Sequence, residues 1–231
     1  MEVSVIKVMV VSPHPDDAEI GAGGTIASWV KQGREVFYVV CTNGDKGSSD
    51  PNMTSETLAK IRQQEQMEAA KILGVSEVIF LGYPDGGLED TPAFRGEMVR
   101  LIRKHRPDVV LTTDPYRKYW WHRDHRITGT VTMDAIFPYA RDHLSYPEHI
   151  AEGLTPHRVS EIYFWGSEEP DTFIDIGETF SIKLAALSCH VSQIGQHAEM
   201  LKQRIEERDS KIGQNQGVPV AEAFRRVELL Y

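Results

Sequence analysis

Residues 6–25 read IKVMVVSPHPDDAEIGAGGT, and this stretch decides the fold. The apolar run from Ile6 to Val11 predicts a buried β-strand, and the segment after the acidic turn predicts the start of a helix. One imidazole and two carboxylates, those of His14, Asp16 and Asp17, therefore fall on the turn at the carboxyl end of a strand. In open α/β sheets this is the edge at which ligands bind.

The spacing of these side chains predicts a metal site. His14 and Asp17 are three residues apart and can face one ion, which leaves Asp16 free to act as a base. A neutral imidazole with a hard carboxylate suits Zn²⁺, with water completing an open coordination sphere. Catalytic zinc normally has three protein ligands, so the pattern asks for a further ligand elsewhere in the chain.

A second cluster supplies candidates for that ligand. His122-Arg123-Asp124-His125 again places two histidines three residues apart. It follows the apolar segment Val109 to Thr112, which predicts another buried strand that ends in a loop. Two clusters that each follow a strand can converge on one edge of a parallel sheet.

Simpler explanations exist for each piece alone. His-Pro-Asp-Asp is common turn chemistry, because proline fixes φ and aspartate favours turns. A His-x-x-His pair at a helix start can be plain surface, and Gly21-Ala22-Gly23-Gly24 superficially resembles a dinucleotide-binding turn. The glycines lack the required spacing, since Ile26 stands where the third glycine belongs, so close helix packing is the better explanation for them. The joint occurrence of both clusters at strand ends favours the metal site.

Alternating periodicities along the chain predict the fold class. Strands are expected at 5–11, 35–41, 78–81, 109–112, 161–165 and 173–176, and helices at 20–32, 55–73, 94–105, 125–137, 180–201 and 218–231. This order predicts an α/β, Rossmann-like, mostly parallel sheet flanked by helices in a single domain. Its core is expected at about 5–195, with a C-terminal helical extension over about 196–231.

Composition and charge limit the classes of partner that we expect for this chain. The 231 residues carry a formal net charge of −9, which argues against a nucleic-acid binder. No apolar run approaches a membrane span, and no basic and hydrophobic leader begins the chain, so neither a membrane partner nor a signal peptide is expected. Cys41 and Cys189 are the two cysteines, and two buried thiols are favoured over a disulfide, which fits a cytoplasmic protein.

The motifs together resemble the LmbE/PIG-L family of zinc-dependent N-deacetylases, and within it the diacetylchitobiose deacetylases. The resemblance rests on PHPDDAEIGAGGT and HRDHR. It also rests on TNGDKG at 42–47, IRQQE at 61–65, LGV at 73–75, LGYPDG at 81–86 and HVSQ at 190–193, and it covers roughly residues 6–195. It implies one Zn²⁺ per subunit, held by His14, Asp17 and His125.

The resemblance also implies catalytic roles. Asp16 would act as the base, and His122 would add charge or a hydrogen bond at the tetrahedral intermediate. Asp124 would orient an imidazole. The family usually has proline where this chain has Arg123, which leaves the ligand spacing intact but puts the shape of the loop in question.

Substrate contacts are predicted at five residues, each with an alternative. Arg62 either reaches the sugar or pairs on the helix surface with Glu65, and Asp85 either accepts from sugar hydroxyls or only shapes a turn. Tyr119 and Trp120 either stack on a pyranose or pack against the domain. His190 lies near the site by resemblance only, and a satisfied buried histidine is the alternative.

The predicted activity is removal of acetyl from an N-acetylglucosamine-containing saccharide or conjugate. An amidase acting on a sugar–thiol conjugate or an acylated antibiotic is the alternative within the class. Outside it stand a metal-dependent phosphoesterase, which would need more ligands than this sequence offers, and a non-catalytic metal- and sugar-binding module. Family resemblance further implies a homo-oligomer, a trimer or hexamer, and the apolar residues at 116–121 and 229–230 could serve its contacts.

Overall fold

The computed structural model describes residues 5–119 and 121–230, except for the side chain of Gln196. The described residues form a seven-stranded sheet in the order β3-β2-β1-β4-β5-β7-β6. Neighbours among the first five strands are parallel, whereas β7 runs antiparallel to both β5 and β6. The strands are β1 (Lys7–Ser12), β2 (Glu35–Thr42), β3 (Glu77–Tyr83), β4 (Val109–Thr113), β5 (Glu161–Trp165), β6 (Thr172–Asp175) and β7 (Ala221–Glu228).

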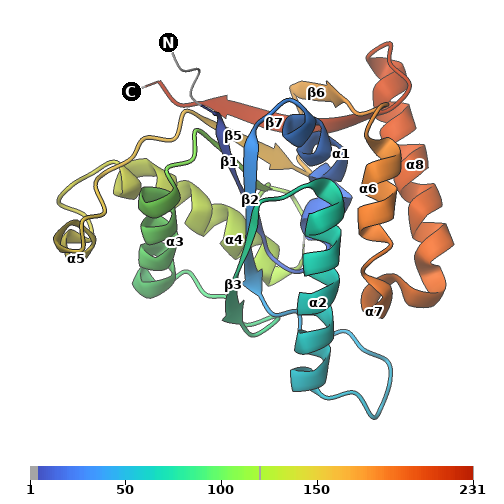
Figure 1. Ribbon diagram of the computed structural model, residues 1–231, viewed down its shortest axis with the longest axis horizontal. Coiled ribbons are helices and arrows are strands. Elements are labelled where there is room, and N and C mark those ends of the chain that lie inside the picture. The colour runs from blue at the N-terminus through green and yellow to red at the C-terminus, as the bar shows by residue number, and fades with distance from the viewer. Residues whose placement is uncertain (1–4, 120, 231) are drawn as a thin grey trace.

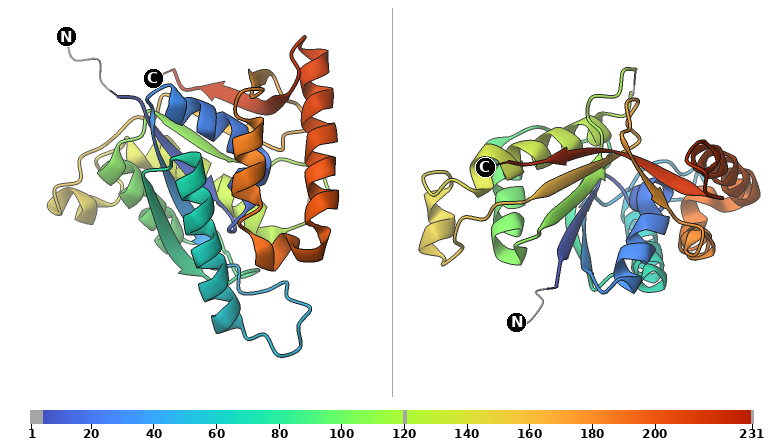
Figure 2. Two further views of the ribbon diagram at one scale, coloured as in Figure 1. Left: turned by 45° about the vertical axis from the view of Figure 1, so that its right-hand side comes forward. Right: turned by 90° about the horizontal axis from the view of Figure 1, so that it is seen from above.

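Helices cover both faces of the sheet (Figures 1 and 2). One face carries α1 (Asp17–Lys31), α2 (Ser55–Leu73), α6 (Phe180–Leu187), α7 (Val191–Ile194), the short η2 (Gly195–His197) and α8 (Ala198–Asn215). The other face carries α3 (Pro92–His105), α4 (Arg123–Asp134) with its irregular continuation η1 (Ala135–Ala140), and α5 (Pro147–Ala151). The predicted Rossmann-like, mostly parallel α/β fold is thereby confirmed.

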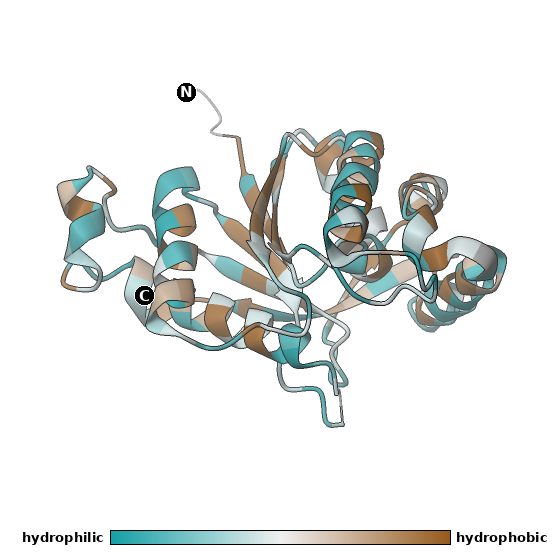
Figure 3. Ribbon diagram, turned by 90° about the horizontal axis from the view of Figure 1, so that it is seen from below, coloured by the Kyte–Doolittle hydropathy of each residue, from teal (hydrophilic) through white to brown (hydrophobic). Residues whose placement is uncertain are grey.

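Successive residues of a strand point to opposite faces of the sheet, so the structure has two separate hydrophobic cores. On β1, Met9 and Val11 pack into the core beneath α3 and α4, while Val8 and Val10 pack into the core beneath α1 and α2. All four are fully buried, because a parallel strand with helices on both faces exposes neither side. Figure 3 shows the hydrophobic colour concentrated on these central strands, with hydrophilic faces on the outer helices.

The segment predicted as a helix at 218–231 is a strand over Ala221–Glu228, so that prediction was wrong. β7 fits between β5 and β6, where Arg226 donates both of its guanidinium contacts to Glu161, at 3.0 and 2.8 Å. β7 pairs with β5 on one side and with β6 on the other. These long-range pairings outweigh the local spacing of apolar residues, which suited a helix.

Other boundaries differ in smaller ways. The helix predicted over 180–201 is divided into α6, α7 and η2, because the chain turns at His190 and again at Gly195, and α8 then begins at Ala198. The fourth predicted helix begins at Arg123 rather than at His125, so both histidines of the second cluster lie at its N-terminus. Cys41 is a buried free thiol as predicted, but the free thiol of Cys189 is only half-buried.

Candidate active site

The carboxyl ends of three parallel strands bring the predicted clusters together. β1 leads into His14, Asp16 and the start of α1, and the neighbouring β4 leads through a loop into His122 and α4. β3 leads into the turn that holds Asp85. The chain reverses its strand order between β1 and β4, and a reversal of this kind opens a crevice at the sheet edge.

His14 lies at the centre of this crevice and is nearly buried. Its Nδ1 is 2.9 Å from Asp17 Oδ2, and its Nε2 is 3.1 Å from both Asp85 Oδ1 and Asp124 Oδ2. Burial by itself lowers the pKa of His14, but the three carboxylates outweigh burial and raise it to about 12. The crevice therefore concentrates negative charge that a cation would neutralise.

Asp17 lies between His14 and His125 and faces both of them. His125 Nε2 is 3.2 Å from the same Asp17 oxygen that faces His14. Bonds of about 2.0–2.1 Å to a tetrahedral ion place neighbouring ligand atoms about 3.3 Å apart, so these separations suit a shared metal. Burial raises the pKa of Asp17, but His125 and His14 overcome it and lower the pKa to about 2.

His122 lies beside the pair but is more exposed. Its ring meets that of His14 edge-on, with centroids 4.5 Å apart. Nitrogens of His14, His122 and His125 lie within 4.8 Å of one another, as do donor atoms of His14, Asp85, His122 and Asp124. More than one donor set around His14 is therefore close enough to hold a metal ion.

Asp124 is fully buried and holds a loop in place. Its Oδ2 accepts from the Gly86 amide at 2.7 Å, and its Oδ1 accepts from the Leu88 amide at 3.1 Å. Burial opposes ionisation, but His14 and these amides lower the pKa of Asp124. Because both of its carboxylate oxygens accept hydrogen bonds from the amides of this loop, Asp124 is better placed to orient His14 than to bind metal.

The backbone at Asp16 adopts a left-handed conformation, with φ at 96°. Such a conformation costs about 1–3 kcal/mol in a non-glycine residue and persists only where the surroundings impose it. Here the Asp16 amide donates to Gln66 Oε1 at 3.1 Å. Burial and the neighbouring Asp17 charge raise the pKa of Asp16 to about 7, against the opposing effect of Arg62.

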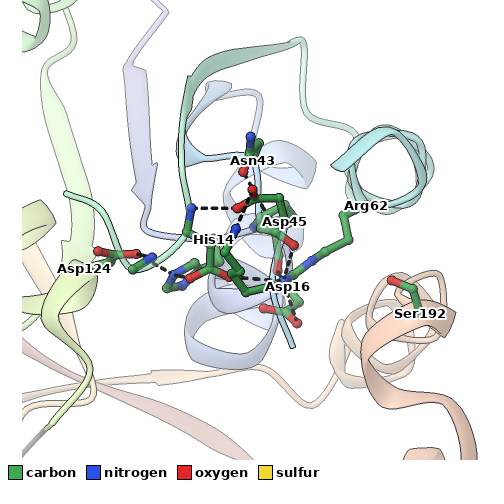
Figure 4. Close-up of polar contacts among 12 residues, drawn as sticks. His14, Asp16, Asn43, Asp45, Arg62, Asp124 and Ser192 are labelled. Atoms are coloured by element: carbon green, nitrogen blue, oxygen red, sulfur yellow. Dashed lines mark hydrogen bonds and ion pairs between the residues drawn. The ribbon is translucent and has the colours of Figure 1, made fainter. Parts of the chain in front are cut away.

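Arg62 is buried and holds the acidic turn from α2. It donates to the Pro15 carbonyl at 2.6 Å and to the Gly44 carbonyl at 3.1 Å, and it lies 3.4 Å from Asp16 Oδ2 (Figure 4). Gly44 must be glycine, because it has a φ of 61° and a Cβ there would lie 2.7 Å from the guanidinium. The alternative of a surface pair with Glu65 is wrong.

Glu65 instead accepts from the amide and hydroxyl of Ser192, at 2.7 and 2.6 Å. These two bonds tie α2 to α7, on the side of Arg62 away from the crevice (Figure 4).

Sequence reasoning missed Gln66 and Glu19. Both are fully buried, and Gln66 Nε2 donates to Glu19 Oε1 at 2.9 Å, so Gln66 connects Glu19 to the Asp16 amide. The signal was present, since Gln66 stands four residues after Arg62 and therefore shares its helix face. His190 Nε2 is 3.5 Å from Glu19 Oε2. Burial lowers the pKa of His190, but the neighbouring Glu19 carboxylate outweighs burial and raises this pKa above its ordinary value.

The remaining predicted contacts divide between the crevice and the surface. Asp85 is at the crevice, 4.0 Å from Arg62 Nη1 and 3.1 Å from His14 Nε2. Tyr119 is 89 % exposed, so it does not pack against its own domain as the alternative required. Trp120 lies outside the described residues.

A cavity of about 470 Å³ adjoins the site on the α8 side. Asp17, His125 and Trp165 are among the residues that line it. Gly21 makes room for that ring, since a Cβ there would lie 2.4 Å from Trp165 Cδ1. The volume falls within the range of small-molecule pockets.

Comparisons with known proteins identify the relatives of this chain. The family model described as PIG-L, GlcNAc-PI de-N-acetylase, matches residues 9–136. The diacetylchitobiose deacetylase of Thermococcus kodakarensis is 37% identical over 189 residues, which cover 82% of this chain and 70% of the relative. The chain belongs to the PIG-L family. This confirms the resemblance inferred from the motifs.

Further relatives define the chemistry of the family. Mycothiol S-conjugate amidase of Streptomyces coelicolor is 34% identical over 181 residues, covering 69% of this chain and 60% of the relative. The solved N,N'-diacetylchitobiose deacetylase from Pyrococcus horikoshii, complexed with its inhibitor MPG, has a TM-score of 0.92 and 32% identity, covering 96% of this chain and 84% of that chain. The PIG-L protein described here is a hydrolase of a metal-dependent N-deacetylase family, and its site has the donors for a metal ion.

Within residues 5–119 and 121–230, no helix is both long enough and apolar enough to cross a membrane.

Proposed function

We propose that this chain is a zinc-dependent hydrolase that removes the N-acetyl group from an N-acetylglucosamine-containing saccharide or conjugate, giving acetate and a free amine. The observation that carries the proposal is the single Asp17 oxygen facing both His14 and His125, with the Asp16 carboxylate on the adjoining residue. The similarity to a diacetylchitobiose deacetylase supports the substrate class.

His14, Asp17 and His125 would hold one Zn²⁺ per subunit. The other donor sets are less suitable, because Asp124 already accepts from two backbone amides and His122 is the most exposed of the three histidines. When bound, zinc lowers the pKa of a coordinated water and polarises a carbonyl oxygen.

Asp16 takes a proton from the attacking water and returns it to the leaving amine. Gln66 and Arg62 keep its carboxylate in place by holding the peptide group between Pro15 and Asp16, Gln66 at its N–H and Arg62 at its carbonyl. His122 donates to the oxygen that becomes negative in the tetrahedral intermediate, a role that its partly exposed position at the mouth permits. Asp124 fixes the His14 ring.

Sugar binding would use the polar groups around the same crevice. Asp85 would accept from sugar hydroxyls, and Arg62 would donate to the sugar beside Asp16. The exposed ring of Tyr119, with Trp120 next to it in sequence, would stack on a pyranose face. His190 would act from behind the site through Glu19.

The test is acetate release from a panel of N-acetylated mono- and disaccharides, with zinc-loaded and chelated protein. His14→Ala, Asp17→Ala and His125→Ala should each lose most bound zinc and nearly all activity. Asp16→Asn should keep zinc and lose about 10²–10⁴-fold in kcat, and His122→Ala should keep zinc with a lower kcat. Stoichiometric zinc in all three ligand variants would contradict the assignment.

A sugar–thiol conjugate or an acylated antibiotic is the second candidate substrate, and the similarity to a mycothiol S-conjugate amidase favours including it. The same panel with such conjugates added separates the two by kcat/KM. A sugar-binding protein without catalysis would bind the panel and release no acetate from any member.

We also propose a homo-oligomer, a trimer or hexamer. Tyr116, Tyr119, Trp121 and Leu230 are between 74% and 89% exposed, which is unusual for large apolar side chains. Light scattering that gives a 26.1 kDa monomer with full activity would contradict the assembly.

A further inference from the structure

The turn that presents Asp85 to the crevice depends on partners outside itself. It runs over Pro84-Asp85-Gly86-Gly87, and the Gly87 amide donates to the Pro84 carbonyl at 3.1 Å. Gly86 has a φ of 76°, the left-handed conformation that a type II turn requires at its third position. This hydrogen bond leaves the amides of Asp85 and Gly86 without an acceptor inside the turn, so each needs one from elsewhere in the chain.

Both acceptors are carboxylates, and they come from different elements. The Asp85 amide donates to Asp45 Oδ1 at 2.9 Å, and the Gly86 amide donates to Asp124 Oδ2 at 2.7 Å. Asp45 belongs to the loop after β2, whereas Asp124 lies in the first turn of α4. The two carboxylates lie on opposite sides of His14 in the view of Figure 4. Asp124 also contacts His14 and belongs to the site already described, but the proposed reaction gives Asp45 no role.

Asp45 is itself held in place. Its amide donates to Asn43 Oδ1 at 3.2 Å, and its Oδ2 accepts from Lys46 Nζ at 2.7 Å. The Asn43 amide donates to the Tyr83 carbonyl at 2.8 Å, which fixes the start of this loop beside the end of β3. Burial raises the pKa of Asp45, but Lys46 and the Asp85 amide outweigh burial and hold this pKa below its ordinary value. The side chain is only 12% exposed, so Asp45 is a fixed and charged acceptor.

The side chain of Asp85 lies among three groups of the site. Its Oδ1 is 3.1 Å from His14 Nε2 and 3.9 Å from His122 Nε2, and its Oδ2 is 4.0 Å from Arg62 Nη1. The amide nitrogen and the Cβ of Asp85 are bonded to the same Cα, so a displaced amide also displaces the carboxylate relative to these groups. A displacement of about 1 Å is enough to reduce the effect of a positioned group severely.

We propose that Asp45 is a positioning residue for substrate binding, which accepts from the Asp85 amide and thereby fixes the Asp85 carboxylate where it accepts from hydroxyls of the sugar. The inference rests on the proposed function, in which Asp85 binds the sugar. Asp45 acts through Asp85 rather than on the substrate, because its two oxygens accept from the Asp85 amide and from Lys46.

The experiment is a double-mutant cycle between Asp45 and Asp85, measured as acetate release from N,N'-diacetylchitobiose by zinc-loaded protein. Asp45→Ala removes the acceptor and should lower kcat/KM about tenfold to a hundredfold, mainly by raising KM. In protein that already carries Asp85→Ala, the same substitution should change kcat/KM by less than about twofold, because no carboxylate remains to be positioned. Asp45→Ala should leave bound zinc unchanged, since neither hydrogen bond of its carboxylate is to a proposed zinc ligand.

Asp50→Ala is the matched control. Asp50 is an exposed residue of the same loop, and its Oδ1 accepts from the Asn52 amide at 2.9 Å. This variant loses a similar hydrogen bond that does not involve Asp85, so its kcat/KM should equal that of the wild type. Asp45→Asn keeps an oxygen for the Asp85 amide and should recover most of kcat/KM. Asp45→Glu keeps the charge but displaces the acceptor by one methylene, and it replaces Asp45→Ala in the cycle if that variant does not fold.

An equal loss of kcat/KM with and without the Asp85 carboxylate would overturn the proposal, because Asp45 would then support only the loop. A kcat/KM for Asp45→Ala within twofold of wild type would overturn it as well. Both results leave the deacetylase intact. Absence of acetate from every saccharide of the panel with wild-type protein would overturn the proposed function and this inference with it.

Discussion

Replacing Gln66 with methionine tests whether Asp16 depends on a side chain outside the predicted motifs. Methionine keeps the length of the side chain but removes the acceptor for the Asp16 amide, at 3.1 Å, and the donor to Glu19, at 2.9 Å. A buried group left without its partner costs about 1–3 kcal/mol. The left-handed backbone at Asp16 has a comparable strain, so losing this hydrogen bond removes much of what sustains it.

A cost of about 1–3 kcal/mol changes an equilibrium by a factor of about 5 to 150. If that cost falls on the conformation that aims the Asp16 carboxylate, kcat for acetate release should drop by the same factor. Metal affinity should change by less than about threefold, because the two hydrogen bonds that the variant loses are to Asp16 and Glu19 and not to a metal donor. The measurement is kcat and KM with zinc-loaded protein, beside metal titration and thermal unfolding.

Two further variants separate positioning from general damage. Gln64→Met is the matched control, since Gln64 lies on the same helix but is exposed and contacts Glu68. Gln66→Glu keeps an acceptor oxygen for the Asp16 amide while placing a second carboxyl next to Glu19, so it should retain more kcat than Gln66→Met at lower stability. A kcat for Gln66→Met within twofold of wild type would refute the reasoning.

Three other changes address the scaffold. Lys183→Met leaves Glu222 buried without its cation and Asp209 with Arg208 alone, so the free energy of unfolding should fall by about 3–5 kcal/mol in denaturant titration, and a loss below 1 kcal/mol would count against the buried network. Gly21→Ala places a Cβ 2.4 Å from Trp165 and should cost about 1–3 kcal/mol in the same assay while narrowing the cavity, which unchanged stability would contradict. The Arg226 hydrogen bond lowers the pKa of Glu161, so this pair stabilises the fold above the unfolded-state pKa of about 4.3, and its contribution disappears as pH falls through the folded-state pKa. Glu161→Gln should therefore lower the Tm slightly at pH 7 and by less at pH 3, and an equal deficit at both values would exclude the ion pair as the cause.

The C-terminal region shows where local sequence fails. AEAFRRVE at 221–228 has apolar residues at spacings that suit a helix, and its two arginines suggest a solvated face. In the structure Glu222 is buried against Lys183 and Arg226 pairs with Glu161, which lie 39 and 65 residues away. Contacts at that separation stabilise the strand, and no window of neighbouring residues contains them.

Asp16 and the residue that holds its backbone show the same difference between sequence and structure. The sequence predicts that the Asp16 carboxylate lies at the site, because Asp16 stands between His14 and Asp17 in one contiguous motif on a turn. Its backbone conformation and its partner Gln66 do not follow, because they depend on how α2 packs beside α1. Composition and spacing likewise do not reveal that the side chain of Tyr119 is exposed whereas that of Arg62 is buried.

The sequence by itself determined the parallel α/β fold and the residues of the two clusters, because apolar periodicity and short motifs are local properties that survive without knowledge of distant contacts. Only the tertiary structure decided that one Asp17 oxygen faces both His14 and His125, that Gln66 holds Asp16, and that Asp45 accepts from the amide of Asp85. Strand order and helix packing set these distances, and they are fixed only when segments far apart in the chain bury their apolar faces together.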